Sequence, residues 1–243
     1  MDTLKMRTAG TEGPAVLLLH GLGATGAVWD GLMAQPGYRW LAPDLPGHGG
    51  SPWLPHYSFG GLAAAVADAL PERGPVLVVG HSLGGVVGLA LASGWFGVKV
   101  AGLLAVGVKV EWSEADLARA AAMAAKPPRV FPSREDAERG FLKIAGLVGI
   151  ADADPDGVAE TEGGWRLALD PRAFAVGAPD MRGLLGAARC PVVLAAGEHD
   201  PMSRPEQLRA FSSFTVEFPG LGHNAHVEDP SALLPFPRQF VGR

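Results

Sequence analysis

The fold is decided by residues 76–93, which read VLVVGHSLGGVVGLALAS. The first four form an uninterrupted apolar run, which is typical of a strand buried on both faces of a parallel sheet. Residues 84–93 have helical character, and the turn between strand and helix reads GHSLG. In this setting Ser82 occupies a tight, strained turn, where side chains at Gly80 and Gly84 would collide. We therefore interpret Ser82 as a candidate nucleophile that lies at the positive end of the following helix.

Short apolar runs of the same kind occur on either side of this stretch. They cover residues 15–19, 39–42, 100–106, 192–196 and, more weakly, 214–218, and residues 4–8 precede them. Segments with helical character alternate with these runs, at residues 26–33, 58–70, 205–211 and 231–241. Alternation of strand and helix predicts an α/β fold, in which a mostly parallel, twisted sheet carries helices on both faces.

The alternation is interrupted between residues 111 and 179, where no convincing strand is found. Residues 114–125 and 133–147 are predicted to be helices, each with a serine placed to cap its start. We interpret residues 111–179 as a helical cap, and residues 1–110 and 180–243 as the α/β core. Aromatic residues of the cap are candidates for substrate contact, or alternatively for a small core of the cap itself. The candidates for substrate contact are Trp112, Phe141 and Trp165.

A serine nucleophile needs a general base, and the base needs a carboxylate that fixes its tautomer. The predicted strand at residues 192–196 runs into Gly197-Glu198-His199-Asp200, and the end of a strand is where α/β sheets carry active groups. We assign Asp200 as the acid, with Glu198 as the competing candidate, and expect a structural role for His199. His223 follows the last predicted strand in a glycine-bearing loop and is our candidate base.

The nearby His226 is expected to support His223 or to lie at the surface. A stabilised oxyanion needs two N–H donors. We assign the backbone N–H of Leu83, which follows the nucleophile, and that of Leu22, in the loop His20-Gly21-Leu22-Gly23 after an earlier strand. His20 is expected to hold loops together by hydrogen bonds.

Five pieces of this chain resemble the α/β-hydrolase superfamily. They are HGLG at residues 20–23, DLPGHG at 44–49, the turn around Ser82, GEHD at 197–200, and Gly222-His223. The resemblance implies a cofactor-free hydrolase without a metal, whose triad is Ser82, Asp200 and His223. It also implies that residues 111–179 are the insertion that follows the sixth strand in this family.

Several reactions are compatible with these pieces. Haloalkane dehalogenases and epoxide hydrolases have an aspartate at the position of Ser82, which argues against both. We expect a serine hydrolase that cleaves a small ester, lactone or thioester. One alternative is a carbon–carbon bond hydrolase of the meta-cleavage type, which needs a cation for its carboxylate substrate. The candidate cations for that alternative are Arg129, Arg134, Arg166, Arg172 and Arg182. The other alternative is a ligand receptor with a vestigial triad.

Composition restricts the class of protein further. The chain has 243 residues, of which 48% are hydrophobic and 19% charged, so one folded α/β domain is expected. The net charge of −5, without a Lys/Arg block, argues against nucleic acid and favours a small, apolar substrate. The single Cys190 forms no intrachain disulfide, and no signal or membrane-spanning segment is evident. We therefore expect a cytoplasmic monomer or homodimer.

Overall fold

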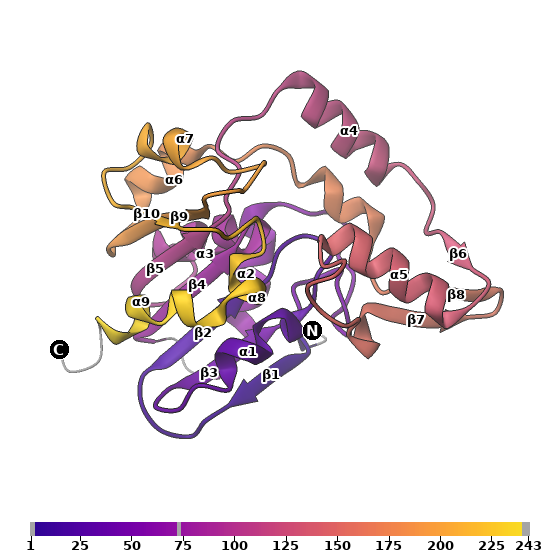
Figure 1. Ribbon diagram of the computed structural model, residues 1–243, viewed down its shortest axis with the longest axis horizontal. Helices are drawn as coiled ribbons and strands as arrows, with labels where there is room; N and C mark the ends of the chain where they lie inside the picture. Colours follow the sequence, from indigo (N-terminus) through magenta and orange to yellow (C-terminus); the bar gives the residue numbers. More distant parts are fainter. Residues whose placement is uncertain (1–2, 72–73, 240–243) are drawn as a thin grey trace.

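The computed structural model describes residues 3–71 and 74–239, and a central sheet organises them (Figure 1). Within these residues the sheet has seven strands in the order β1-β3-β2-β4-β5-β9-β10. All neighbouring strands are parallel except β1 and β3, which are antiparallel. The bounds are β1 Met6–Ala9, β2 Ala15–Leu19, β3 Arg39–Pro43, β4 Val76–His81, β5 Val100–Val106, β9 Val192–Gly197 and β10 Thr215–Phe218. The expected mostly parallel sheet is confirmed.

Strand β4 shows why its sequence is apolar at every position rather than alternating. All six of its residues are buried. Val76 and Val78 contribute to one hydrophobic cluster, whereas Leu77 and Val79 contribute to a second. Because successive side chains of a strand point to opposite faces, two clusters around one strand mean that both faces are covered.

Helices cover both faces, as the alternation predicted. One cluster includes residues from α2 (Phe59–Ala69), α3 (Leu83–Ala92), α6 (Met181–Ala187) and α7 (Pro205–Arg209). The other includes residues from η1 (Gly26–Trp29), α1 (Asp30–Met33), α8 (Ala225–Glu228), η4 (Pro230–Leu233) and α9 (Pro235–Arg238). The helix expected at residues 26–33 is thus a 3₁₀ turn followed by one short α-turn. The helix expected at 231–241 is divided in the same way, and residues 240 and 241 lie outside the described residues.

The segment from residue 111 to 179 has the two expected helices, α4 (Glu114–Ala124) and α5 (Arg134–Ala145). The side chains of Ser113 and Ser133 accept hydrogen bonds from the backbone N–H groups of Asp116 and Asp136, as caps do. In Figure 1 the two helices lie at the upper right, beside the sheet.

This segment is not wholly helical, which corrects the sequence-based expectation. It contains a three-stranded antiparallel sheet in the order β6-β8-β7, together with two 3₁₀ turns. The bounds are β6 Val130–Phe131, η2 Pro155–Gly157, β7 Val158–Thr161, β8 Gly164–Leu167 and η3 Pro171–Val176. Strands of two to four residues are too short to show a period of two, so the pattern gave no signal for them.

The small sheet and α5 enclose a hydrophobic cluster of their own. Its buried residues, apart from Ala24, come from the inserted segment between Phe131 and Val158. Several hydrogen bonds connect this segment to the rest of the chain, two of them between side chains of residues far apart in the sequence. Thr25 Oγ1 donates to Asp154 Oδ2 at 2.6 Å, and Tyr57 donates its hydroxyl to Asp170 Oδ2 at 2.8 Å.

The described part of the chain has no helix that is both long and apolar enough to cross a membrane.

Candidate active site

Ser82 lies in a strained turn at the junction of β4 and α3. Its φ of 49° and ψ of −112° make it the one non-glycine with a positive φ among the described residues. A Cβ on Gly80 would lie 2.4 Å from the carbonyl oxygen of Gly84, and one on Gly84 would lie 2.1 Å from that of Leu19. The two glycines therefore permit a close approach of backbone segments that turns Ser82 outward at the end of the sheet.

Asp200 and His223 are brought together although they lie 23 positions apart in the sequence. His223 Nδ1 lies 2.8 Å from Asp200 Oδ2, and Asp200 is buried at the end of β9. The other carboxylate oxygen accepts the backbone N–H groups of Met202 and Ser203 at 2.8 and 3.1 Å. Because both oxygens are held, Asp200 fixes the orientation of the imidazole and leaves its Nε2 available to a nucleophile.

The competing carboxylate, Glu198, has a different partner. Its Oε2 accepts the backbone N–H of Gly220 at 2.8 Å, and the side chain is exposed. The side chain of His199 is exposed as well, and its backbone N–H donates to the carbonyl of Leu221. The geometry thus favours Asp200 over Glu198 as the acid.

The two predicted oxyanion donors lie beside Ser82. Leu22 and Leu83 both line the cavity that contains Ser82 and His223. Among the described residues, no protein acceptor is found for the backbone N–H of either leucine. Both N–H groups are therefore available to a ligand oxygen.

His20 holds the loop of Leu22 in place. Its Nδ1 donates to the carbonyl of Gly21 at 2.8 Å, and its Nε2 accepts the N–H of Leu45 at 2.8 Å. Burial lowers the pKa of His20 to about 4, which agrees with this neutral tautomer.

Behind the candidate base lies a row of aromatic rings that sequence reasoning did not find. His81 donates Nε2–H to the carbonyl of His223 at 2.9 Å, and its ring centre lies 4.6 Å from that of His223. The ring of His226 lies 4.3 Å from His81 and 4.4 Å from Trp29. His226 is only 1% exposed, which excludes the surface and leaves the other expectation, support of His223, here through the ring of His81. The spacing of histidines in the sequence does not show that a helical turn, α8, folds His226 inward.

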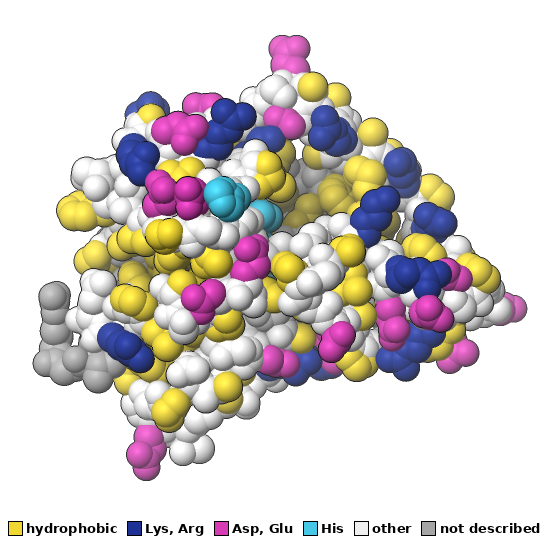
Figure 2. Space-filling model, viewed as in Figure 1, with side chains coloured by type: hydrophobic (Ala, Val, Ile, Leu, Met, Phe, Trp, Pro, Cys, Tyr) yellow, Lys and Arg dark blue, Asp and Glu magenta, His cyan; other side chains and the backbone are white. Residues whose placement is uncertain are grey.

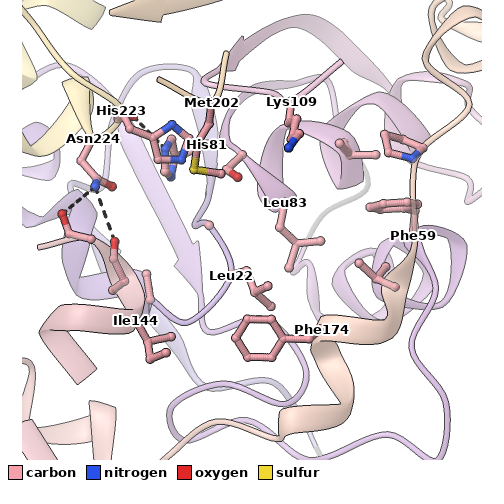
Figure 3. A pocket seen from close by; sticks show the side chains of 18 of the residues that line it. Leu22, Phe59, His81, Leu83, Lys109, Ile144, Phe174, Met202, His223 and Asn224 are labelled. Carbon is pink, nitrogen blue, oxygen red and sulfur yellow. Dashed lines mark hydrogen bonds between the residues drawn. The ribbon is translucent and has the colours of Figure 1, made fainter. Parts of the chain in front are cut away.

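A cavity of about 390 Å³ opens in front of Ser82 and His223. In Figure 3, His81, His223 and Met202 stand at one end of it, with Ile144 and Phe174 at the other. The remaining wall is also largely apolar, with Leu22, Phe59, Leu83 and Trp112 among its residues. Its cationic side chains are Lys109 and Lys143, and no Asp or Glu of the described chain lines it.

The structure places one of the three predicted substrate contacts, Trp112, at this cavity. Phe141 and Trp165 do not line it, which corrects their assignment. Phe141 is 3% exposed and packs against Gly157 inside the small hydrophobic cluster. Trp165 lies in β8, packed against that cluster, with the guanidinium of Arg134 over its ring at 5.4 Å. These two aromatic residues build the inserted segment itself, which was the alternative interpretation.

Comparison with known proteins agrees with this geometry. The model of the alpha/beta hydrolase family matches residues 16–235. The lipase LipV of Mycobacterium tuberculosis is 34% identical over 176 residues, which cover 68% of this chain and 67% of LipV. A pimeloyl-(acyl-carrier protein) methyl ester esterase of Methylococcus capsulatus is 42% identical over 91 residues, 37% of this chain and 35% of the esterase. This second match therefore spans about a third of that relative's length.

Among solved structures, E-2-(acetamidomethylene)succinate hydrolase has a TM-score of 0.80 and 24% identity, and the match covers 98% of this chain and 94% of that one. This likeness shows the fold. The family model, in addition, matches most of the chain, and LipV is similar to it over about two thirds of its length. The chain therefore belongs to the alpha/beta hydrolase family.

Proposed function

We propose that this chain is a serine hydrolase that cleaves a small ester, lactone or thioester with the triad Ser82, Asp200 and His223. The observation that carries the proposal is the 2.8 Å contact between Asp200 and His223, in a cavity that also contains the strained Ser82. Relatives named lipase and methyl ester esterase support a hydrolase that acts on ester bonds.

The proposed reaction has two halves. His223 Nε2 takes the hydroxyl proton of Ser82 as Oγ bonds to the substrate carbonyl carbon, and the N–H groups of Leu22 and Leu83 stabilise the oxyanion. The bond to the leaving group then breaks, and the alkoxide or thiolate takes the proton from His223. Water, deprotonated by His223, next attacks the acyl-enzyme. Ser82 recovers its proton as the acid leaves.

The apolar wall of the cavity supports a substrate with an apolar acyl or alcohol part. Within our proposal, residues 111–179 form a cap over the core of residues 1–110 and 180–243. The cap supplies Trp112, Ile144 and Phe174 to the wall. None of the five arginines considered for the carbon–carbon hydrolase alternative lines this cavity, whose cations are Lys109 and Lys143, so those arginines give that alternative no support at Ser82.

The test is the turnover of short p-nitrophenyl esters by the wild type and by Ser82→Ala. We expect the variant to lose activity by about a thousandfold or more. Ser213→Ala makes the same chemical change at an exposed position outside the cavity and should retain full activity. Equal rates for wild type and Ser82→Ala would refute the proposal.

A fluorophosphonate probe gives a second readout that does not depend on the choice of ester. It should label the wild type on a peptide that contains Ser82 and leave Ser82→Ala unlabelled. Binding of small esters without turnover or labelling would instead favour the receptor alternative.

A further inference from the structure

A second cavity lies next to the catalytic one, inside the proposed cap. Its volume is about 430 Å³, and its apolar wall includes Met123, Phe131, Leu167 and Leu169. We call it the cap groove. Ile144 and Phe174 line both the cap groove and the catalytic cavity, as does Lys143. The two cavities are therefore adjacent, with these three side chains at their boundary.

The charged residues of the cap groove are all cations. They are Lys126, Arg129 and Lys143, and no Asp or Glu in the described ranges lines it. Figure 2 shows a hollow with a hydrophobic floor, with histidines in cyan on one side and Lys and Arg side chains in dark blue on the other. Histidines line the catalytic cavity, which the cap groove adjoins. Cations beside low-dielectric walls create a local positive potential, even in a chain whose net charge is −5.

These three cations have no ion-pair partner within residues 3–71 and 74–239. The contact of Lys126 is with the sulfur of Met123 at 3.7 Å, and the guanidinium of Arg129 lies 4.6 Å from the ring centre of Phe131.

Three other arginines of the same segment are paired. Arg134 contacts Glu138, Arg139 contacts Glu135, and Arg172 contacts Asp170. Arg119 and Arg166 also lack an ion-pair partner among the described residues, but neither lines the groove or the catalytic cavity. Three of the five unpaired cations of residues 111–179 thus line the cap groove.

We propose that the cap groove binds the anionic end, a carboxylate or a phosphate, of an elongated substrate whose ester carbonyl lies at Ser82. This inference rests on the proposed function and extends it to a substrate class, an ester with an apolar body and a distal anion. The body would lie along Ile144 and Phe174. Arg129 suits the anion because a guanidinium donates two parallel hydrogen bonds to carboxylate or phosphate oxygens.

The first experiment measures binding without turnover. Decanedioate, decyl phosphate and the neutral decane-1,10-diol are titrated into wild-type protein by calorimetry. We expect at least one anion to bind about tenfold more tightly than the diol, with the advantage reduced by added salt. The better anion identifies the head group as carboxylate or phosphate.

Variants locate the effect. Arg129→Gln and Lys143→Gln should each weaken binding of that anion by about fivefold and leave the diol unchanged. Arg119→Gln removes the same charge from an exposed position of α4 that lines neither cavity, and should change nothing. The inference is overturned if the diol binds as tightly as both anions, or if Arg119→Gln weakens anion binding as much as Arg129→Gln.

The second experiment separates the inference from the proposed function. Mono-p-nitrophenyl decanedioate should have a lower KM than p-nitrophenyl decanoate, and Arg129→Gln should raise KM for the first ester with kcat unchanged. Serine-dependent hydrolysis of both esters with equal KM leaves the proposed function standing and removes the inference. If neither these esters nor the short p-nitrophenyl esters are hydrolysed, the proposed function is contradicted, and the calorimetry still decides whether the groove binds anions.

Discussion

Gly84 allows helix α3 to begin directly against strand β2, and this contact sets the backbone around Ser82. A methyl group at Gly84 would have to displace the carbonyl of Leu19, which lies 2.1 Å from the expected Cβ position. Backbone in a packed sheet cannot move by that amount without strain.

We therefore expect Gly84→Ala to lower the free energy of unfolding by about 1–3 kcal/mol and to reduce kcat. Gly186→Ala is the matched control, because nothing lies within 4 Å of its Cβ position in α6. It should stabilise the protein by about 0.5–1 kcal/mol. Chemical denaturation and ester turnover measure both effects, and equal stability of the two variants would contradict the prediction.

Asp200 holds His223 by one short contact, and its second oxygen is occupied by backbone N–H groups. Asp200→Asn keeps the shape but presents an amide, so we expect kcat to fall by about 10⁴-fold with little change in melting temperature. Glu198→Gln, an equivalent change at an exposed side chain, should alter kcat less than about threefold. A larger loss in Glu198→Gln than in Asp200→Asn would assign the acid to Glu198 instead.

Three buried histidines make stability depend on acid. Burial lowers the pKa of His20 to about 4, and those of His48 and His226 to about 3, from an ordinary value of 6.5. The unfolded chain therefore binds more protons than the folded one between pH 6.5 and 3. The contribution of these neutral histidines to the free energy of unfolding is fully present above pH 6.5. It is lost as the pH falls through this window, by up to about 1.4 kcal/mol per pH unit for each histidine.

His226 tests this account because neither of its ring nitrogens has a hydrogen-bond partner among the described residues. His226→Phe should reduce the acid dependence of the free energy of unfolding and keep stability at pH 7. The exposed His56 supplies the control, since His56→Gln removes an imidazole that is not buried. The prediction is contradicted if the free energy of unfolding falls by the same amount from pH 7 to pH 4 in the wild type and in His226→Phe.

At the scale of elements, helix α5 contributes side chains both to the small hydrophobic cluster and to the catalytic cavity. Phe141 points into the small cluster of the inserted segment, whereas Ile144, one turn later, lines the catalytic cavity beside Phe174 of η3. Side chains three positions apart lie on neighbouring, but not identical, parts of a helix surface. Packing of the small cluster and lining of the catalytic cavity are thus divided within one turn.

This division predicts different outcomes for two phenylalanines. Phe141→Ala should lower the free energy of unfolding by about 3–5 kcal/mol, because it leaves a void in a packed cluster. Phe174→Ala should change stability less and raise KM for esters with apolar acyl chains. Thermal unfolding and kinetics on the same two variants check both, and a larger KM effect for Phe141→Ala would reverse the assignment.

Some elements of the core and of the inserted segment could be predicted because their signals are local. The buried run of β4 and the capping serines of α4 and α5 read directly from the sequence. The strands β6, β7 and β8 could not, because their pairing is a tertiary property of segments with two to four residues. The same reason explains why Phe141 was assigned to the substrate. The helical pattern indicates that Phe141 is on an apolar face, but it does not show whether that face packs in the small cluster or lines the catalytic cavity.

At the scale of the whole molecule, the positions of Ser82, Asp200 and His223 follow from the strand order, since each follows the end of a neighbouring or nearby parallel strand. Chain order was therefore enough to propose them. The lining of the two cavities depends on how the inserted segment rests on the core, through contacts such as Thr25 with Asp154. No motif encodes that placement, so the cap groove is visible only in the folded chain.

The separate hydrophobic cluster of the inserted segment also bears on how this protein changes over evolution. Nearly all of its buried side chains come from that segment, and the two sheet clusters contain none of them. Mutations in the segment are thus largely uncoupled from the packing of the sheet clusters, since residues without shared contacts have nearly additive effects. A mutant library restricted to Trp112, Ile144 and Phe174 should yield enzymes with altered substrate range and intact folding far more often than one restricted to core positions.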